Sequence, residues 1–181
     1  MTLVEIGTLI ISIAVVIAQI KIVFLIVFGL INPKEGDAGY GLARFIGKNS
    51  ILFAFIIALG AMCGSLFFSE IAHYTPCEFC WYQRIFMYSQ VFIFGLALIR
   101  REKFIRAYGF LLSIIGAFIA LNHVILQRTG SSPIPCNAVG QSVSCSKVFV
   151  NEFGFVTIPL MAFTAFIYII VVLWFGRKYD R

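Results

Sequence analysis

The chain has 181 residues and a mass of 20.3 kDa, and 61% of its residues are hydrophobic whereas 12% are charged. Soluble proteins carry about 25% charged residues, so this composition and a mean hydropathy of +0.98 exclude a soluble enzyme and a disordered chain. The net charge of +6 arises from Lys and Arg residues at the ends of apolar runs. Because these residues do not follow one stripe, we expect no nucleic-acid partner.

Five apolar runs predict five membrane-spanning helices, because each run is long enough, or nearly so, to cross a hydrocarbon core of about 30 Å. The runs do not alternate between apolar and polar residues as the strands of an outer-membrane barrel would. The expected fold is an all-α integral membrane protein, a four-helix transmembrane bundle with one extra N-terminal transmembrane helix. The runs cover residues 7–31, 51–68, 81–99, 107–126 and 153–175.

The first run is predicted to stay in the mature protein, because residues 1–7 contain no Lys or Arg and the apolar stretch is too long for a secretory signal. We expect two parts, residues 1–48 with the extra helix and its cytoplasmic loop and residues 49–181 with the bundle. Gln19 and Lys21 interrupt the first run. The sequence leaves open whether Lys21 reaches the membrane interface or pairs with another helix.

The distribution of Lys and Arg predicts the orientation, because cytoplasmic loops are enriched in these residues. Ten of the 14 lie in the first and third loops and at the C-terminus, whereas only Arg128 and Lys147 lie in the other loops. The pattern predicts an external N-terminus, a cytoplasmic C-terminus and a multi-pass protein of the cytoplasmic (inner) membrane. The ten residues are Lys34, Arg44, Lys48, Arg100, Arg101, Lys103, Arg106, Arg177, Lys178 and Arg181.

Small residues predict close packing at two helix faces, because they let helix backbones approach each other. Gly60 and Gly64 are four residues apart in the second run. In the fourth run, one face carries small residues at helical spacing, namely Gly109, Ser113, Gly116 or Ala117, and Ala120. We expect both faces to contact neighbouring helices.

The predicted topology sorts the cysteines into two external pairs and one membrane residue. Cys77 and Cys80 end the first external loop, and Cys136 and Cys145 lie in the second. Cys63 lies within a span, where we expect a small buried apolar side chain. Paired cysteines in an oxidising compartment usually form disulfides. The sequence leaves open how the four external cysteines pair.

The residues around Cys77 and Cys80 favour a reactive pair over a static disulfide. Thr75-Pro76 before Cys77 and Glu78 after it are typical of a helix start with Thr75 as N-cap. Cys77 would then lie in the first helical turn, where the helix dipole stabilises a thiolate, the form that exchanges. A disulfide between residues three apart closes almost no loop and contributes little stability. Electron exchange is therefore the better interpretation.

Arg84 follows Cys80 by four residues, so it lies on the same helix face and about 6 Å deeper. Two interpretations stay open for a charge at this depth. Its guanidinium reaches back to the interface, or it pairs with a thiolate or with an electronegative head group of a ligand. Gln83, Met87 and Gln90 continue a partly polar strip along the helix, and we expect this strip to line a pocket.

The segment that begins the third run resembles the DsbB family of disulfide-bond formation proteins, especially its BdbC-like branch. It reads Cys77-Glu78-Phe79-Cys80-Trp81-Tyr82-Gln83-Arg84-Ile85. The later pair of loop cysteines and a final span that contains proline extend the resemblance over residues 50–175. The resemblance implies a four-helix bundle that takes electrons from an extracytoplasmic thioredoxin-fold thiol oxidase, a DsbA-like protein. Two exchanging cysteine pairs would pass the electrons to a membrane quinone, either ubiquinone or menaquinone.

The resemblance also implies a role for each cysteine. Cys136 would form the mixed disulfide with the partner protein, Cys145 would exchange with Cys77, and Cys80 would contact the quinone ring. Only eight residues separate Cys136 from Cys145, a shorter loop than in the enterobacterial branch. This difference leaves open which loop cysteine meets Cys77.

The same resemblance implies a quinone-binding group that includes Cys80. Arg84 would stabilise the charge that develops on the quinone, and His123 occupies the place of a family histidine near the ring. Gln83 and Met87 complete the expected site. The few acidic residues and the two histidines do not suggest a metal or flavin site, so we predict no metal.

Three rival functions have a basis in the sequence. The four external cysteines can in principle form a zinc or iron–sulfur site. A quinone reductase similar to vitamin K epoxide reductase also has two cysteine pairs, but its helix-borne pair follows the loop pair, whereas here it precedes it. A transporter or scaffold would need polar residues at the midplane, for which Gln19 and Lys21 are the only indication.

Overall fold

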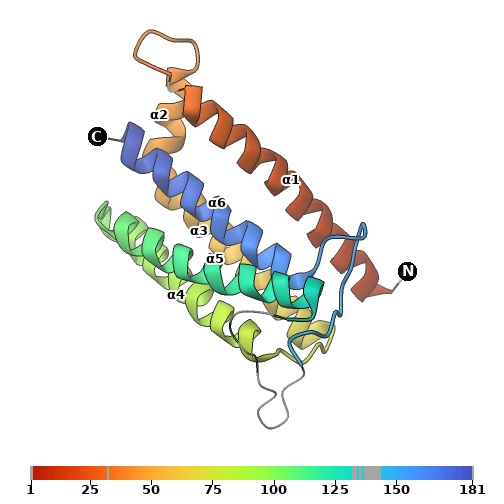
Figure 1. Cartoon of the computed structure of the whole chain (residues 1–181). Coiled ribbons are helices and arrows are strands. Elements are labelled where there is room, and N and C mark those ends of the chain that lie inside the picture. The colour runs from red at the N-terminus through yellow and green to blue at the C-terminus, as the bar shows by residue number, and fades with distance from the viewer. Residues whose placement is uncertain (1, 32, 132–133, 135, 137–143, 181) are drawn as a thin grey trace.

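The computed structural model describes residues 2–31, 33–131, 134, 136 and 144–180. Five of its helical segments are long and apolar enough to cross a membrane, with α3 and η1 forming one of them. This result confirms the predicted all-α fold with five spans. The short α2 was not predicted and lies between the first two spans (Figure 1). The elements are α1 (Leu3–Ile31), α2 (Tyr40–Lys48), α3 (Ser50–Leu66), the π-helix η1 (Phe67–Ile71), α4 (Glu78–Arg100), α5 (Ile105–Thr129) and α6 (Ile158–Tyr179).

Helices α3 to α6 form an up-and-down bundle in which α6 closes the ring against α3 (Figure 1). Its centre is built from apolar side chains that are fully enclosed, among them Phe94, Phe166 and Ile169. Helix α1 lies outside this bundle and packs along α6. The predicted architecture, four bundle helices and one extra N-terminal helix, is confirmed. The division of the chain after residue 48 stays a prediction.

The small residues of α5 pack closely, whereas those of α3 do not. A Cβ atom at Gly109 would lie 2.4 Å from the Phe94 ring, and one at Gly116 would lie 2.3 Å from the Phe166 ring. A Cβ atom at Gly60 or Gly64 would meet no heavy atom of another described segment within 4 Å. The predicted packing is therefore confirmed for α5 and wrong for α3, because α1 packs on α6 and leaves this face of α3 lining a cavity.

The last span begins later than predicted. Phe153 and Gly154 have positive φ angles of 53° and 74°, and they form a turn between Glu152 and Val156, which pair as an isolated β-bridge. Helix α6 begins at Ile158 with a proline in its first turn. A proline is tolerated there because the first N–H groups of a helix have no intrahelical acceptor.

Cys63 and the polar residues of α1 are placed differently from one another relative to the bundle. Cys63 is exposed on the protein surface and lines the cavity, so the predicted burial is wrong. Lys21 is exposed on α1, whereas the neighbouring Gln19 donates a hydrogen bond to the Thr164 hydroxyl of α6 at 3.1 Å. It is therefore Gln19 that links α1 to the bundle at this level.

The bundle has two chemically different ends. We call the end with Cys77, Cys80, Cys136 and Cys145 the cysteine end. We call the opposite end the basic end, because α2, the turn between α4 and α5 and the last turn of α6 bring most of the Lys and Arg residues there (Figure 1). Arg181 lies outside the described residues.

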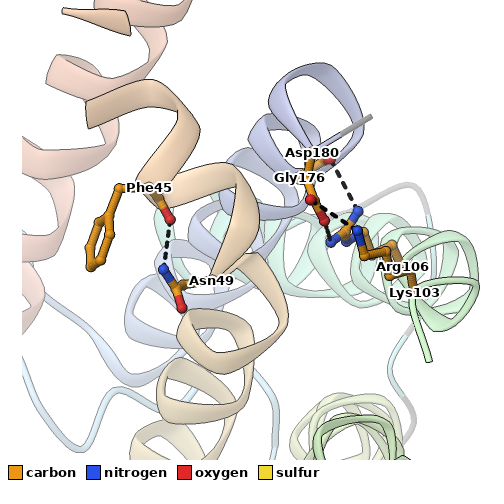
Figure 2. Close-up of polar contacts among 6 residues, drawn as sticks. All are labelled: Phe45, Asn49, Lys103, Arg106, Gly176 and Asp180. Carbon is orange, nitrogen blue, oxygen red and sulfur yellow. Dashed lines mark hydrogen bonds and ion pairs between the residues drawn. The ribbon is translucent and has the colours of Figure 1, made fainter. Parts of the chain in front are cut away.

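A buried ion pair joins α5 to the last turn of α6 at the basic end (Figure 2). Arg106 pairs with Asp180 and donates to the Gly176 carbonyl at 3.1 Å, and Lys103 Nζ donates to Asp180 at 3.0 Å. Burial raises the pKa of Asp180, but the hydrogen bonds from Arg106 and Lys103 outweigh burial and keep this pKa below its ordinary value. Nearby, Asn49 Nδ2 donates to the Phe45 carbonyl at 2.9 Å, where α2 meets α3.

Candidate active site

Cys77 stands at the start of α4, but two helix positions earlier than predicted. Helix α4 begins at Glu78, and Cys77 is its N-cap residue, with an extended backbone at φ −81° and ψ 176° and no capping bond from its side chain. The Cys77 carbonyl accepts the first helical hydrogen bond from Trp81 N at 3.2 Å. The prediction of Thr75 as N-cap is therefore wrong. In the extended conformation the Cys77 sulfur turns into the protein and is buried rather than lying along the helix surface.

Cys77 and Cys80 form a dithiol in this structure. Their sulfur atoms are 3.1 Å apart, which is contact distance and longer than a disulfide bond of about 2.05 Å. Cys77 is 4% exposed, whereas Cys80 is partly exposed. One helical turn thus holds two thiols in the position that a disulfide between them would require.

The loop cysteines Cys136 and Cys145 are joined in a disulfide. Cys145 is 2% exposed and packs in one cluster with Cys77 and Phe79. Ligand atoms of Cys77, His123 and Cys145 all lie within 4.8 Å of one another. The two cysteine pairs are therefore adjacent, and it is Cys145 of the loop pair that lies beside Cys77.

His123 of α5 lies between the two pairs and is 2% exposed. The Gln83 amide nitrogen is 3.1 Å from Nδ1 and can only donate, so Nδ1 accepts and the proton is on Nε2. Nε2 is 3.0 Å from the Cys145 carbonyl and 3.7 Å from the Cys77 sulfur. Gln83 therefore fixes the tautomer with which His123 donates toward both cysteines.

The surroundings of Cys77 favour its thiolate. The hydrogen bond from Cys80 is the main cause that lowers the pKa of Cys77, and the hydrogen bond from His123 lowers it further. Burial acts in the opposite direction but is weaker than these contacts together. A thiolate is the form of cysteine that acts as nucleophile and as leaving group in thiol–disulfide exchange, so this environment is suited to that chemistry.

Arg84 is held by α3 rather than by a thiolate. Its Nε donates to the Ser65 hydroxyl at 2.9 Å, and its Nη2 donates to the Ser65 carbonyl at 3.1 Å. The guanidinium also lies over the Trp81 ring, 5.4 Å from the centroid. These contacts leave part of the guanidinium facing the cavity, which Arg84 lines.

A cavity of about 660 Å³ extends from the cysteines into the membrane-spanning part of the molecule. This volume is typical of a site for a small organic ligand. The five residues predicted to bind a quinone all line it, namely Cys80, Gln83, Arg84, Met87 and His123. Gln90, predicted to continue the strip, does not line this cavity. It is fully buried and accepts a hydrogen bond from Ser113 of α5 at 2.8 Å.

Sequence reasoning missed two contributors to the cavity. Tyr88 lines it, and its buried hydroxyl has no hydrogen-bond partner among the described residues. The spacing was a usable signal, because Cys80, Arg84 and Tyr88 follow one another at four-residue intervals on one helix face. Helix α1 also lines the cavity, and no motif in its sequence indicated this.

The donor set near Cys77 bears on the possibility of a metal site. Cys77, His123 and Cys145 are close enough to hold an ion together, but the Cys145 sulfur is bonded to Cys136. Metals bind cysteine as the thiolate, so this set fits an ion only after the loop disulfide is reduced. The four-cysteine site that the sequence allowed is not the group that the structure gathers. The prediction of no metal stays a prediction.

The membrane-spanning bundle holds a dithiol, in which Cys77 is favoured as a thiolate, next to a disulfide whose Cys145 is buried. These features define a membrane thiol–disulfide oxidoreductase. Residues 47–176 match the family described as Disulfide bond formation protein DsbB, and the chain belongs to this family. Helix α1 lies outside the matched residues.

Individual relatives agree with the family match. The chain is 46% identical over 129 residues to Disulfide bond formation protein C of Bacillus subtilis (strain 168), covering 68% of this chain and 91% of that protein. It is 43% identical over 124 residues to Probable disulfide formation protein C of Halalkalibacterium halodurans, covering 68% and 90%. It is 40% identical over 125 residues to Probable disulfide formation protein of Oceanobacillus iheyensis, covering 69% and 86%. No solved structure matches the chain significantly.

Proposed function

We propose that the protein reoxidises an extracytoplasmic thioredoxin-fold dithiol oxidase of the DsbA type and passes the electrons to a membrane quinone. One observation carries this proposal. The Cys80 sulfur lies at the boundary between the disulfide chemistry of the cysteine end and a cavity that continues among the membrane helices. A quinone supplies an acceptor for two electrons and two protons that is soluble in the bilayer.

The first exchange takes place at the loop pair. A thiolate of the reduced partner attacks Cys136, the Cys136–Cys145 bond breaks, and Cys145 leaves as a thiolate. The second thiolate of the partner then attacks the mixed disulfide, so the partner departs oxidised and the loop pair is reduced by two electrons. Cys145 is buried and held beside Cys77, which supports Cys136 as the sulfur that the partner attacks.

The second exchange moves the electrons to the helix pair. Cys145 attacks Cys77 of a Cys77–Cys80 disulfide, and Cys136 then attacks Cys145, which restores the loop disulfide and leaves two thiols on α4. The pairing in the structure, a loop disulfide beside a helix dithiol, corresponds to the state after this step. His123 stabilises the Cys77 thiolate as it leaves, because its Nε2–H points toward that sulfur.

The helix dithiol is oxidised in the third step. Cys77 and Cys80 give up two electrons and two protons to the quinone and form a disulfide with each other. Arg84 is the group that stabilises negative charge on the acceptor, and Ser65 fixes its orientation. Tyr88 lies one turn deeper and lines the cavity, so its hydroxyl would be a second hydrogen-bond donor to a bound quinone. Gln83 and Met87 complete the site around the ring.

The proposal includes the side of the membrane that each end of the bundle faces. The basic end and the cysteine end lie at opposite ends of the bundle, and the positive-inside rule puts the basic end in the cytoplasm. The cysteines then face the compartment in which a dithiol oxidase works. Labelling of intact cells with an impermeant maleimide after reduction tests this. Protection of all loop cysteines until the membrane is opened would contradict it.

Disulfide mapping under anaerobic conditions tests the electron path. We expect the purified protein with a Cys77–Cys80 dithiol to form that disulfide after addition of ubiquinone-1 or menaquinone-4, and not after addition of solvent alone. Arg84→Ala should raise the apparent quinone KM by about tenfold, because it removes a charged donor worth ~1.5 kcal/mol or more. A dithiol that neither quinone oxidises would overturn the proposal. Zinc in the purified protein together with four reduced cysteines would favour a metal site instead.

The family match also bears on the reductase and transporter hypotheses. Membership in the DsbB family favours this reaction over that of a reductase similar to vitamin K epoxide reductase. The transporter hypothesis rests on Lys21 and Gln19. Lys21 is exposed on α1 and Gln19 is bonded to Thr164, so neither supports a polar path through the bundle.

A further inference from the structure

Helix α1 is fixed to the bundle at both of its ends. At the cysteine end it approaches η1 so closely that a Cβ atom on Gly7 would lie 2.3 Å from the Phe67 ring. At the basic end a Cβ atom on Gly29 would lie 2.3 Å from the Trp174 ring. Lys178 Nζ also donates to the Gly29 carbonyl at 2.9 Å. Such contacts define one position of α1 against the bundle.

The middle of α1 is different, because there the cavity separates it from α3. Ala14 and Ala18 of α1 line the cavity, as do Gly60 and Gly64 of α3. Apart from the nearby backbone of α3 itself, no heavy atom of the described residues lies within 4 Å of the Cβ position at either glycine. Four small residues on two helices thus set the width of this part of the cavity. Gln19, next to Ala18, is bonded to Thr164 of α6 and holds this stretch of α1 in place.

The cavity changes character along its length. Its polar lining groups gather near Cys80, where Gln83, Arg84 and His123 lie. From Gly64 to Ile56, both of which line the cavity, α3 rises by about 12 Å. The lining of this deep half is dominated by small and apolar side chains from α1, α3 and α6. A polar end joined to a long apolar channel matches a quinone ring joined to an isoprenoid tail.

We propose that α1 forms one wall of the quinone site, and that the isoprenoid tail lies between α1 and α3, where Ala14, Ala18, Gly60 and Gly64 determine which tails fit. This inference rests on the proposed function, because it assigns the ligand of the same cavity. It gives α1, which lies outside the family match, a direct part in substrate selection. The tail then contacts this chain along its length and is not left in lipid.

Matched substitutions test the width of the channel. Ala18→Leu and Gly60→Leu add side-chain volume inside it, whereas Ala107→Leu makes the same change on an exposed face of α5. We expect the first two variants to raise the apparent KM for menaquinone-4 by at least about tenfold, equivalent to ~1.4 kcal/mol. The KM for menadione, which shares the ring but has no tail, should stay within about twofold. Ala107→Leu should change neither value. Circular dichroism and the melting temperature identify a variant that fails to fold.

Photo-crosslinking supplies a readout that does not depend on turnover. A menaquinone analogue with a photoreactive group on its tail should label peptides from residues 7–18 and 56–64, and excess menaquinone-4 should compete. Labelling of α3 without α1, or an Ala18→Leu variant with unchanged KM values, would overturn the role of α1. Failure of the wild-type dithiol to reduce either quinone would instead overturn the proposed function. Equal changes of KM for menadione and menaquinone-4 would show that α1 shapes the ring site and not a tail channel.

Discussion

The two ends of the bundle both bury reactive or charged groups, but they use them differently. At the basic end, Arg106 is paired with Asp180 and bonded to the Gly176 carbonyl, and this arrangement fixes α5 against α6. At the cysteine end, Cys77 and Cys80 are in contact without being bonded. The ion pair fixes one arrangement of α5 and α6. The two thiols can form and break disulfide bonds without a movement of α4.

The comparison shows how a small membrane protein can combine a rigid frame with exchange chemistry. Closely packed helices position the thiols of α4, and the segment between α5 and α6 carries the second cysteine pair. His123 connects the two, because its Nε2 lies near both the Cys77 sulfur and the Cys145 carbonyl. Substitutions at the cysteine end should therefore change activity more than stability, and substitutions at the basic end should do the opposite.

The largest effect on activity is expected for Cys80→Ser. The variant retains the shape of the site but cannot form the helix disulfide, so oxidation of a DsbA-type partner by quinone should be abolished. The melting temperature in detergent should change little, because the dithiol contributes no covalent link in this state. Ser89→Ala, on an exposed part of the same helix, is the matched control and should keep full activity. Unchanged turnover in Cys80→Ser would refute the assigned electron path.

The largest effect on stability is expected for Asp180→Asn. It leaves buried Arg106 without its charge partner, and breaking a buried pair costs ~3 kcal/mol. Lys103→Met should cost less than about 1 kcal/mol of unfolding free energy, because the Lys103 side chain is 63% exposed and its ion pair is weakened by solvent. Denaturant unfolding in mild detergent measures both. Turnover by the folded Asp180→Asn protein should stay close to that of the wild type, and a selective loss of activity would contradict the separation of the two ends.

The same ion pair predicts a direction of pH dependence. The folded-state pKa of Asp180 is lowered, so its contribution to stability is complete above the ordinary carboxyl pKa. It is lost as the pH falls through the lowered value. Asp180→Asn should therefore remove part of the acid sensitivity of unfolding, and this is measured with the same denaturant series.

The sequence predicted which residues are neighbours on one helix better than which residues of two helices are in contact. Cys77, Cys80 and Arg84 are neighbours on α4 because helical periodicity alone puts them there. The contact of Arg84 with Ser65 depends on how α4 packs on α3, and no spacing in the sequence encodes it. The N-cap was misplaced by two residues, because capping rules rank residue types and favour Thr75, whereas the structure gives the extended N-cap backbone to Cys77, whose side chain is buried.

The glycines show the same limit, because the sequence does not predict their contacts with other helices. Gly116 and Gly60 have similar surroundings in the sequence, and both predicted close packing. Gly116 meets Phe166, whereas Gly60 faces the cavity. The difference arises from the position of α1, which packs on α6 through contacts such as Gly29 with Trp174. A single sequence does not show which neighbour a small residue meets, so the contribution of α1 to the cavity could not be predicted.

A smaller effect is expected for His123→Asn, which shortens the side chain and removes its contact with Cys77. Because Cys80 is the main cause of the lowered pKa of Cys77 and His123 a further one, the pKa should rise but stay below that of a free thiol. The pH midpoint of Cys77 alkylation should move up by about one unit, equivalent to ~1.4 kcal/mol. Mass spectrometry of the reduced protein identifies the alkylated cysteine. His73→Asn, in the exposed segment before α4, is the control, and an equal shift there would contradict a direct role of His123.

The smallest effect is expected for Tyr88→Phe. The substitution removes a buried hydroxyl that has no partner among the described residues, so the protein without quinone loses no hydrogen bond and should be at least as stable. Loss of one neutral hydrogen bond to the quinone costs ~0.7 kcal/mol, which raises the apparent KM by about threefold while kcat stays nearly constant. Tyr82→Phe is the matched control, because Tyr82 donates to Glu78 on the exposed side of α4 and does not line the cavity. If both variants had the same KM as the wild type, the Tyr88 hydroxyl would have no contact with the quinone, and Arg84 alone would orient the ring.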